Sequence, residues 1–226
     1  MCGRFVLFSS SEEIRKTFPI DSIQAKVSPD YNVCPTRHIL SILNENGQNI
    51  LVAMQWGLVP SWAKDRSLAV RMINARSETL SEKPAFRNAF KKRRCLIPAN
   101  GYYEWQGEKG NRQPWYITTE TGTPLAFAGL WERWIDRNSP DHSPLDSCTI
   151  VTTEAIDSIR HIHDRMPLIP APEHYESWLD PKLENPAELN RILRTGAVEP
   201  MTCYPVSKAV NSVRSTGPDL IQRIAV

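Results

Sequence analysis

Short runs of apolar residues, separated by turn-forming residues, recur along most of the chain, and this pattern is typical of β-strands. HILSILN and NILVAMQW flank residues 45–48, and the Asn46-Gly47 pair between them is a strong signal for a β-hairpin. Further runs rich in β-branched or aromatic residues follow: RCLIPA, YYEW, PWYITT, PLAFAGLWERW, CTIVTT and, later, MTCYPVS. We therefore predict a meandering, largely antiparallel sheet.

Helical signals are fewer and lie around these strands. Ser10 to Glu13 has the pattern of a capping box that opens a short helix through Phe18. PAFRNAFKK predicts a helix started by Pro84, and HYESWL and AELNRIL predict peripheral helices. The polar stretch from Asp136 to Asp146 predicts an exposed loop rather than a linker, because strands continue on both sides of it. We expect one α+β domain over residues 1–226.

The composition is that of an ordinary globular protein, with 226 residues of which 41% are apolar and 23% charged. No run of about 18 apolar residues and no apolar leader is present, so we expect a cytoplasmic protein with no membrane partner. The five cysteines are scattered singly, which disfavours a disulfide framework and favours a reducing compartment. The histidines and cysteines lack metal-ligand spacing, so we expect no metal or cofactor. Nothing in the sequence indicates an oligomer, and we expect a monomer.

The net charge is only +2, but it is unevenly distributed. Residues 60–95 hold ten Lys or Arg against three Asp or Glu, whereas the rest of the chain is net acidic. This concentration is consistent with an anionic partner such as nucleic acid. The alternative is that Lys91 to Arg94 only decorate the end of a helix, where cations offset the helix dipole.

The first residues, MCGRF, contain the most distinctive candidate chemistry. If the initiator methionine is removed, Cys2 carries a free α-amine and a thiol on one carbon. An α-amine titrates at about 7.7–8.0, against about 10.4 for lysine, so much more of it can attack an aldehyde at neutral pH. The thiol could then close a thiazolidine ring. Gly3 leaves room for close approach, and Arg4 falls on the same side as Cys2 in an extended segment. The alternative is a cysteine without a role.

Three other segments offer functional side chains, each weak by itself. Asn74 and Arg76 are two residues apart within the basic stretch, so an extended backbone turns both to one face. Glu104 lies among aromatic residues in GYYEW, where desolvation would raise its pKa, although most strand glutamates are simply exposed. HIHDRMP places an imidazole beside a carboxylate and an arginine, although a single histidine is more often structural.

Taken together, seven segments resemble one family: MCGRF, YNVCP, WGLVPSW, INARSET, GYYEW, HDRMP and YPVSKAVN, in this order. They are similar to those of the SOS-response-associated peptidase (SRAP) family, and the resemblance runs from Cys2 to about Asn211. It implies a single α+β domain around a bent, barrel-like sheet with a positive groove. It also implies recognition of abasic sites in single-stranded DNA and a covalent bond to them.

Carried over residue by residue, the resemblance implies four catalytic positions: Cys2, Asn74, Glu104 and His163, not His161. His163 would assist opening of the abasic sugar, and the Cys2 amine would add to its aldehyde. Glu104 would move protons while Asn74 orients the adduct and the thiol closes the ring.

The matching motifs also imply DNA contacts. Arg4, Arg76 and Arg165 are expected to hold phosphates that flank the lesion. Pro35, Trp62 and Trp105 are expected to form apolar platforms that stack bases or block a continuous duplex. For each tryptophan, core packing is the alternative.

Two other functions stay open at this point. The first is a thiol peptidase or self-processing enzyme that uses Cys2 with His163 or Glu104 as base. The second is a non-covalent reader of modified bases. The expected partner is single-stranded DNA with abasic sites, and a bacterial source would imply association with the nucleoid. The sequence leaves open whether replication-fork proteins, such as a helicase or polymerase, deliver the protein.

Overall fold

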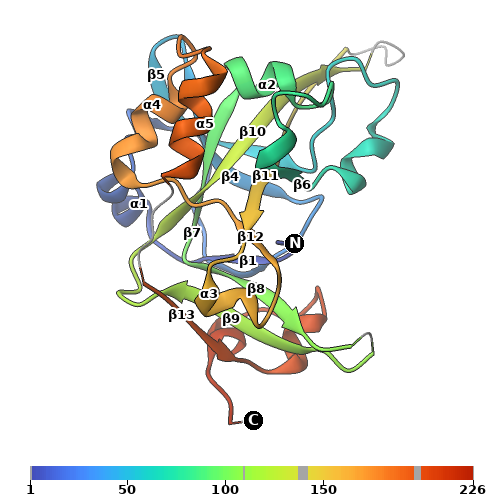
Figure 1. Ribbon diagram of the computed structural model, residues 1–226, viewed down its shortest axis with the longest axis vertical. Helices are drawn as coiled ribbons and strands as arrows, with labels where there is room; N and C mark the ends of the chain where they lie inside the picture. The colour runs from blue at the N-terminus through green and yellow to red at the C-terminus, as the bar shows by residue number, and fades with distance from the viewer. Residues whose placement is uncertain (1, 109, 137–141, 196–199, 226) are drawn as a thin grey trace.

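Two β-sheets form the framework of the protein, with short helices at the periphery (Figure 1). The structure is a computed structural model that describes residues 2–108, 110–136, 142–195 and 200–225. The larger sheet contains β2 (Ser22–Ile23), β4 (His38–Glu45), β5 (Gln48–Trp56), β6 (Asn74–Arg76), β7 (Arg94–Ala99), β10 (Leu125–Ile135), β11 (Pro144–Glu154) and β12 (Arg165–Pro167). The smaller sheet contains β1 (Phe5–Leu7), β3 (Asp30–Val33), β8 (Gly101–Gln106), β9 (Gln113–Thr119) and β13 (Met201–Pro205).

The larger sheet closes on itself. Its strand order is β12-β11-β10-β7-β4-β5-β2, and β6 pairs with β11 off this path. A parallel pairing of β11 with β5, through Ser147 opposite Gln55 and Cys148 opposite Trp56, joins the two ends of the path β11-β10-β7-β4-β5. Five strands therefore form a closed barrel, and the expected α+β class with a bent, barrel-like sheet is confirmed.

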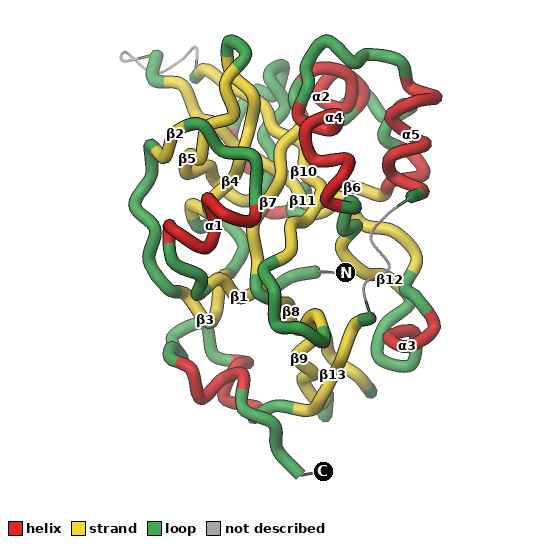
Figure 2. Tube along the Cα trace, turned by 90° about the vertical axis from the view of Figure 1, so that its left-hand side faces the viewer, coloured by secondary structure: helices red, strands yellow, loops and turns green. Residues whose placement is uncertain are grey.

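The smaller sheet has the order β13-β9-β8-β1-β3, and its pairs are antiparallel. In β1 and β8, Phe5 lies opposite Tyr102, and the Tyr103 N–H donates to the carbonyl of Arg4 at 2.9 Å. This register lays residues 2–4 along β8. In both Figure 1 and Figure 2 the start of the chain accordingly lies between β8 and β12, where the two sheets meet.

Local signals in the sequence are confirmed at the start of one helix and at one hairpin turn. Ser10 caps α1 (Ser11–Thr17), and both halves of the predicted capping box with Glu13 are present. Asn46 and Gly47 join β4 to β5 with φ of 54° and 85°. Positive φ at both central residues is the geometry that an Asn-Gly hairpin turn requires.

Three predictions need correction. The helix α2 (Arg87–Lys92) begins after Pro84, since Phe86 is its N-cap. The strands do not form one meander: β7 and β8 are consecutive in the chain but belong to different sheets. The loop predicted from Asp136 to Asp146 is shorter, because Pro144–Asp146 already belong to β11, and residues 137–141 lie outside the described residues.

The remaining helices are α3 (Asp157–Arg160), α4 (Tyr175–Leu179) and α5 (Pro186–Arg194). Figure 2 shows α2, α4 and α5 grouped at one end of the molecule, and α4 and α5 match the predicted peripheral helices. Among the described residues, no helix is both long enough and apolar enough to cross a membrane.

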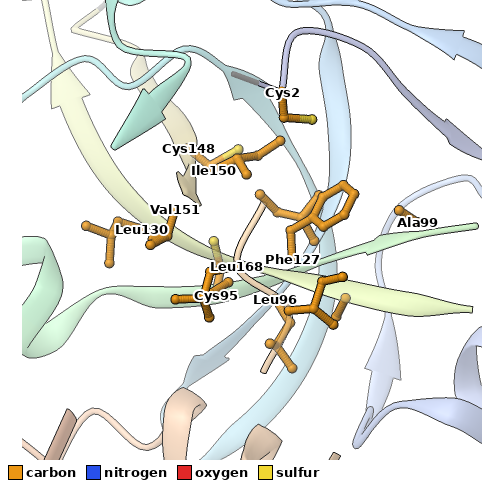
Figure 3. Close-up of a cluster of buried hydrophobic side chains, with 14 of the residues drawn as sticks. Cys2, Cys95, Leu96, Ala99, Phe127, Leu130, Cys148, Ile150, Val151 and Leu168 are labelled. Carbon is orange, nitrogen blue, oxygen red and sulfur yellow. The ribbon is translucent and has the colours of Figure 1, made fainter. Parts of the chain in front are cut away.

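One hydrophobic cluster draws residues from both sheets and from the helices. Figure 3 shows part of it, with Cys2, Cys95, Phe127 and Cys148 among the labelled side chains. All five cysteines are free thiols. Because Cys2 belongs to this cluster, its side chain is fixed by the core rather than by surface contacts.

The basic run at the end of α2 is largely structural. Arg94 is buried and donates to the backbone carbonyls of Phe90, Lys91, Trp178 and Asp180. In the same run, Arg93 pairs with Glu132 at 2.6 Å and Lys92 with Glu184 at 3.3 Å. These contacts weigh against an anionic partner for Lys92, Arg93 and Arg94, and the expectation that the run only decorates a helix end is wrong for Arg94, which is buried as the first residue of β7.

Candidate active site

Cys2 is fully buried beside β8. In this sequence Met1 precedes it, so Cys2 does not carry the α-amine. Its thiol lies 3.9 Å from the carbonyl of Arg4, which also accepts the N–H of Tyr103. Burial raises the pKa of the Cys2 thiol far above its ordinary value, and the nearby carboxylate of Glu104 raises it further. The thiol is therefore protonated at neutral pH.

Asn74 holds Cys2 from the opposite sheet. β6 pairs in parallel with β11, with Asn74 opposite Ile150 and Arg76 opposite Thr152. Between them Ala75 is buried, so Asn74 and Arg76 share the other face of β6, as the sequence pattern predicts. The Asn74 side-chain amide donates to the carbonyl of Cys2 at 2.8 Å. Its Oδ1 is buried without a hydrogen-bond partner among the described residues.

Glu104 lies on β8 and is only 3% exposed. Burial raises its pKa from an ordinary 4.5 to about 7. The desolvation expected from the aromatic GYYEW context is therefore present. Since a carboxyl with this pKa is about half ionised at neutral pH, it can both donate and accept a proton.

His163 lies in the turn between α3 and β12. Its Nδ1 accepts the backbone N–H of Arg165 at 2.9 Å and is 2.8 Å from a carboxylate oxygen of Asp164. Burial lowers the pKa of His163, against the opposing charge of Asp164. Asp164 also raises the pKa of Glu104 slightly, which places this turn near Glu104. His161 has a different environment, with its ring edge-on to Trp115 at 5.6 Å.

The three arginines expected to bind phosphate differ in their availability. Arg4 donates to the Asn32 side chain at 2.6 Å and to the carbonyl of Val210 at 2.8 Å. Arg165 forms a two-pronged ion pair with Glu78, at 2.7 and 3.1 Å. By contrast, the exposed side chain of Arg76 forms no ion pair or hydrogen bond with any described residue.

The apolar side chains expected to contact DNA lie in different settings. Trp62 is 60% exposed, which excludes core packing for this residue. Trp105 is half-buried, its Nε1 donates to Asn211 at 2.7 Å, and the guanidinium of Arg4 lies over its ring at 5.8 Å. Pro35 is half-buried and follows Cys34 after the end of β3. Trp105 directly follows Glu104 in β8, so its side chain points to the opposite face of that strand.

Two residues of the site were missed by sequence reasoning. Tyr102 is fully buried, and its hydroxyl lacks a hydrogen-bond partner among the described residues. Burial raises its pKa, and the charges of Cys2 and Glu104 add to this effect, so the three side chains are neighbours. Glu78 was missed as the partner of Arg165, although it lies in the same INARSE segment as Arg76.

These contacts bring Cys2, Asn74, Glu104 and Tyr102 together where the two sheets meet, with the His163 turn beside them. The site therefore offers a polar anchor for the Cys2 backbone, a buried carboxyl that titrates near neutrality and an imidazole. Acid–base groups of this kind assist the addition of an amine to a carbonyl compound.

Comparison with known proteins gives a family match over nearly the whole chain. The model of the family described as SOS response associated peptidase (SRAP) matches residues 1–213. Abasic site processing protein YoqW of Bacillus subtilis is 43% identical over 225 residues, covering 98% of this chain and 99% of that protein. Abasic site processing protein YedK of Escherichia coli is 30% identical, covering 99% of this chain and 100% of that protein.

The fold is also similar to solved structures. The crystal structure of a protein from Bacteroides thetaiotaomicron matches with a TM-score of 0.84 and 26% identity, covering 99% of this chain and 100% of that one. The similarity thus includes the strands that position the site.

Proposed function

Because this chain belongs to the SOS response associated peptidase (SRAP) family, we propose that it captures abasic sites in single-stranded DNA as a covalent adduct of Cys2. The relatives named above are abasic site processing proteins. The observation that carries the proposal is the convergence of Asn74 and Glu104 on Cys2. One residue holds the backbone of Cys2, and the other supplies a proton-transfer group beside it.

The reaction we propose begins after removal of Met1. The Cys2 amine adds to the aldehyde carbon of the opened abasic sugar, and the carbonyl oxygen takes up a proton. That oxygen then leaves as water to give an imine. The thiol adds to the imine carbon, its proton passes to the nitrogen, and a thiazolidine results. These steps together release one water and need no oxidant or reductant.

The protonation states fit this order of steps. A buried, protonated thiol is a poor first nucleophile, because attack requires the thiolate. The amine therefore attacks first and the thiol second. Burial raises the pKa of Glu104, so this carboxyl can take the proton from the amine and return it to the departing oxygen. His163 lies in the turn that also carries Asp164, whose charge acts on Glu104, and it assists opening of the sugar as a proton donor or acceptor.

The same protonation states weigh against a peptidase led by a Cys2 thiolate. Catalytic cysteines of peptidases have a lowered thiol pKa, whereas burial raises this one. The peptidase function predicts repeated turnover of peptides, whereas adduct formation predicts one DNA strand per protein. A non-covalent reader predicts that Cys2→Ala leaves every DNA interaction intact.

Replacing the thiol alone tests the proposal. Cys2→Ser keeps the amine but cannot close the sulfur-containing ring, so we expect an imine that survives denaturation only after borohydride reduction. The wild-type adduct should survive without a reductant. A Cys2→Ser adduct that is equally stable without borohydride would contradict the role of the thiol.

A further inference from the structure

A hollow beside the active site contains cations that the catalytic scheme does not use. It has a volume of about 570 Å³ and is lined by Trp105, Gly110, Arg112, Lys208 and Asn211. Small-ligand pockets typically have volumes of about 300–1,000 Å³, so the hollow is large enough for a nucleotide unit. It lies between the tip of the β8–β9 hairpin and the 3₁₀ helix Lys208–Asn211.

The two cations of this hollow are available to a ligand. Arg112 and Lys208 are both exposed, and Lys208 Nζ donates to the Asn111 side chain at 2.9 Å. Within the described parts of the chain, neither cation pairs with a carboxylate, in contrast to Arg165, which pairs with Glu78. Two unneutralised cations at the rim of one hollow are suited to a phosphate group.

The walls of the hollow are fixed relative to each other. The indole N–H of Trp105 donates to Asn211 Oδ1 at 2.7 Å, which ties β8 to the 3₁₀ helix. Behind it, the Gln113 side-chain amide donates to the carbonyl of Val206 at 2.8 Å. The Val206 N–H donates to the carbonyl of Pro114 at 3.0 Å. The hollow is therefore formed before any ligand arrives, and little ordering is needed on binding.

The hollow is linked to the reacting groups through Arg4. Trp105 follows Glu104 on β8, so the two side chains point to opposite faces of the strand. Arg4, two residues after Cys2, lies over the Trp105 ring and so connects the two faces. On the other side, Arg112 is near enough to His163 for its charge to add to the effect of burial in lowering the pKa of that histidine. A DNA strand that runs from a sugar held at Cys2 past Arg4 would therefore reach the hollow.

We infer that this hollow is a nucleotide subsite, in which Arg112 and Lys208 bind the phosphate of the nucleotide next to the abasic sugar and Trp105 contacts its base. Asn211 holds the Trp105 ring in place. This inference rests on the proposed function, because it takes the DNA strand as the ligand. Such phosphate contacts raise affinity without regard to base sequence.

The experiment measures binding of intact, fluorescein-labelled oligothymidine by anisotropy as a function of salt. The variants are Arg112→Gln, Lys208→Gln and the double variant, all at exposed positions. Each single change should weaken binding about 3- to 10-fold, and each lost contact should make the log–log salt slope shallower by about 0.7. The matched control is Lys182→Gln, an exposed cation between α4 and α5, and its affinity should be unchanged.

A parallel assay with an abasic oligonucleotide separates this inference from the proposed function. If the wild-type protein forms the adduct and the double variant binds intact DNA as tightly as wild type, the subsite is overturned and the proposed function stands. If the double variant binds more weakly but no protein forms an adduct, the subsite stands and the covalent chemistry falls.

Discussion

Replacing Glu104 by glutamine should stabilise the fold at alkaline pH while it removes the proton-transfer group. Burial raises the pKa of this carboxyl from an ordinary 4.5 to about 7. Each unit by which the pKa rises on folding corresponds to about 1.36 kcal/mol, so ionised Glu104 lowers the free energy of unfolding by about 3 kcal/mol. The side chain is 3% exposed, so solvent screening does not reduce this value substantially.

The sign follows from the two protonation equilibria. Below about pH 4.5 the carboxyl is protonated in both the folded and the unfolded chain, and its contribution to stability is fully present. As pH rises toward 7 the unfolded chain ionises first, and this contribution is lost. Above pH 7 the folded protein carries the full penalty of a buried carboxylate. A glutamine side chain at this position is neutral and cannot ionise.

Urea unfolding of wild type and Glu104→Gln between pH 4.5 and pH 8.5 measures the difference. The free energy of unfolding of the variant, minus that of wild type, should rise by about 3 kcal/mol across this range. Glu173→Gln, at an exposed position, serves as the matched control, and its difference should stay constant. The rate of adduct formation by Glu104→Gln should fall about 10²-fold or more. A difference in stability that does not change with pH would refute the inference that Glu104 is desolvated.

Three further changes test the roles of other residues. Arg76→Glu should weaken binding to intact single-stranded DNA about tenfold or more, because it reverses an exposed charge that no described residue neutralises. Unchanged affinity in a filter-binding assay would remove Arg76 from the phosphate contacts. Asn74→Ala removes the hydrogen bond to the Cys2 carbonyl, which is worth about 0.5–1.5 kcal/mol. Adduct formation should be about 3- to 10-fold slower, with no change in the adduct mass. A rate equal to that of wild type on a time-course gel would contradict this role. Gly101→Ala would place a Cβ 2.6 Å from the Ile117 carbonyl oxygen and the Tyr116 ring. The free energy of unfolding should fall by about 1–3 kcal/mol. An unshifted urea midpoint would show that β8 and β9 can move apart to accommodate the methyl group.

Features specified by neighbouring residues were predictable from the sequence. The capping box of Ser10 with Glu13 and the Asn46-Gly47 turn each depend on a few consecutive residues, and both are present. The alternation of Asn74, Ala75 and Arg76 across β6 is likewise a property of any extended strand.

Features set by distant partners were not predictable. The barrel closes through Ser147 opposite Gln55. β7 and β8 enter different sheets, and Asn100 between them accepts the backbone N–H groups of Phe8 and Ser9. The sequence likewise gives no sign that Arg94 is buried against four carbonyls. In each case the partner lies far away in the chain.

The candidate site likewise combines residues that could be predicted from the sequence with contacts that could not. Motif resemblance placed Cys2, Asn74, Glu104 and His163 in one site, and the convergence of the first three is visible in the fold. Which arginines are already paired depends on tertiary contacts such as Arg165 with Glu78 and could not be predicted.

The most direct test of the central claim is the intact mass of Met1-free protein after incubation with a single-stranded oligonucleotide that carries one abasic site. We predict a single product equal to protein plus oligonucleotide minus one water, and an undamaged oligonucleotide should give none. If the trimmed protein keeps its unmodified mass in the presence of the lesion, the claim that Cys2 captures abasic DNA is wrong.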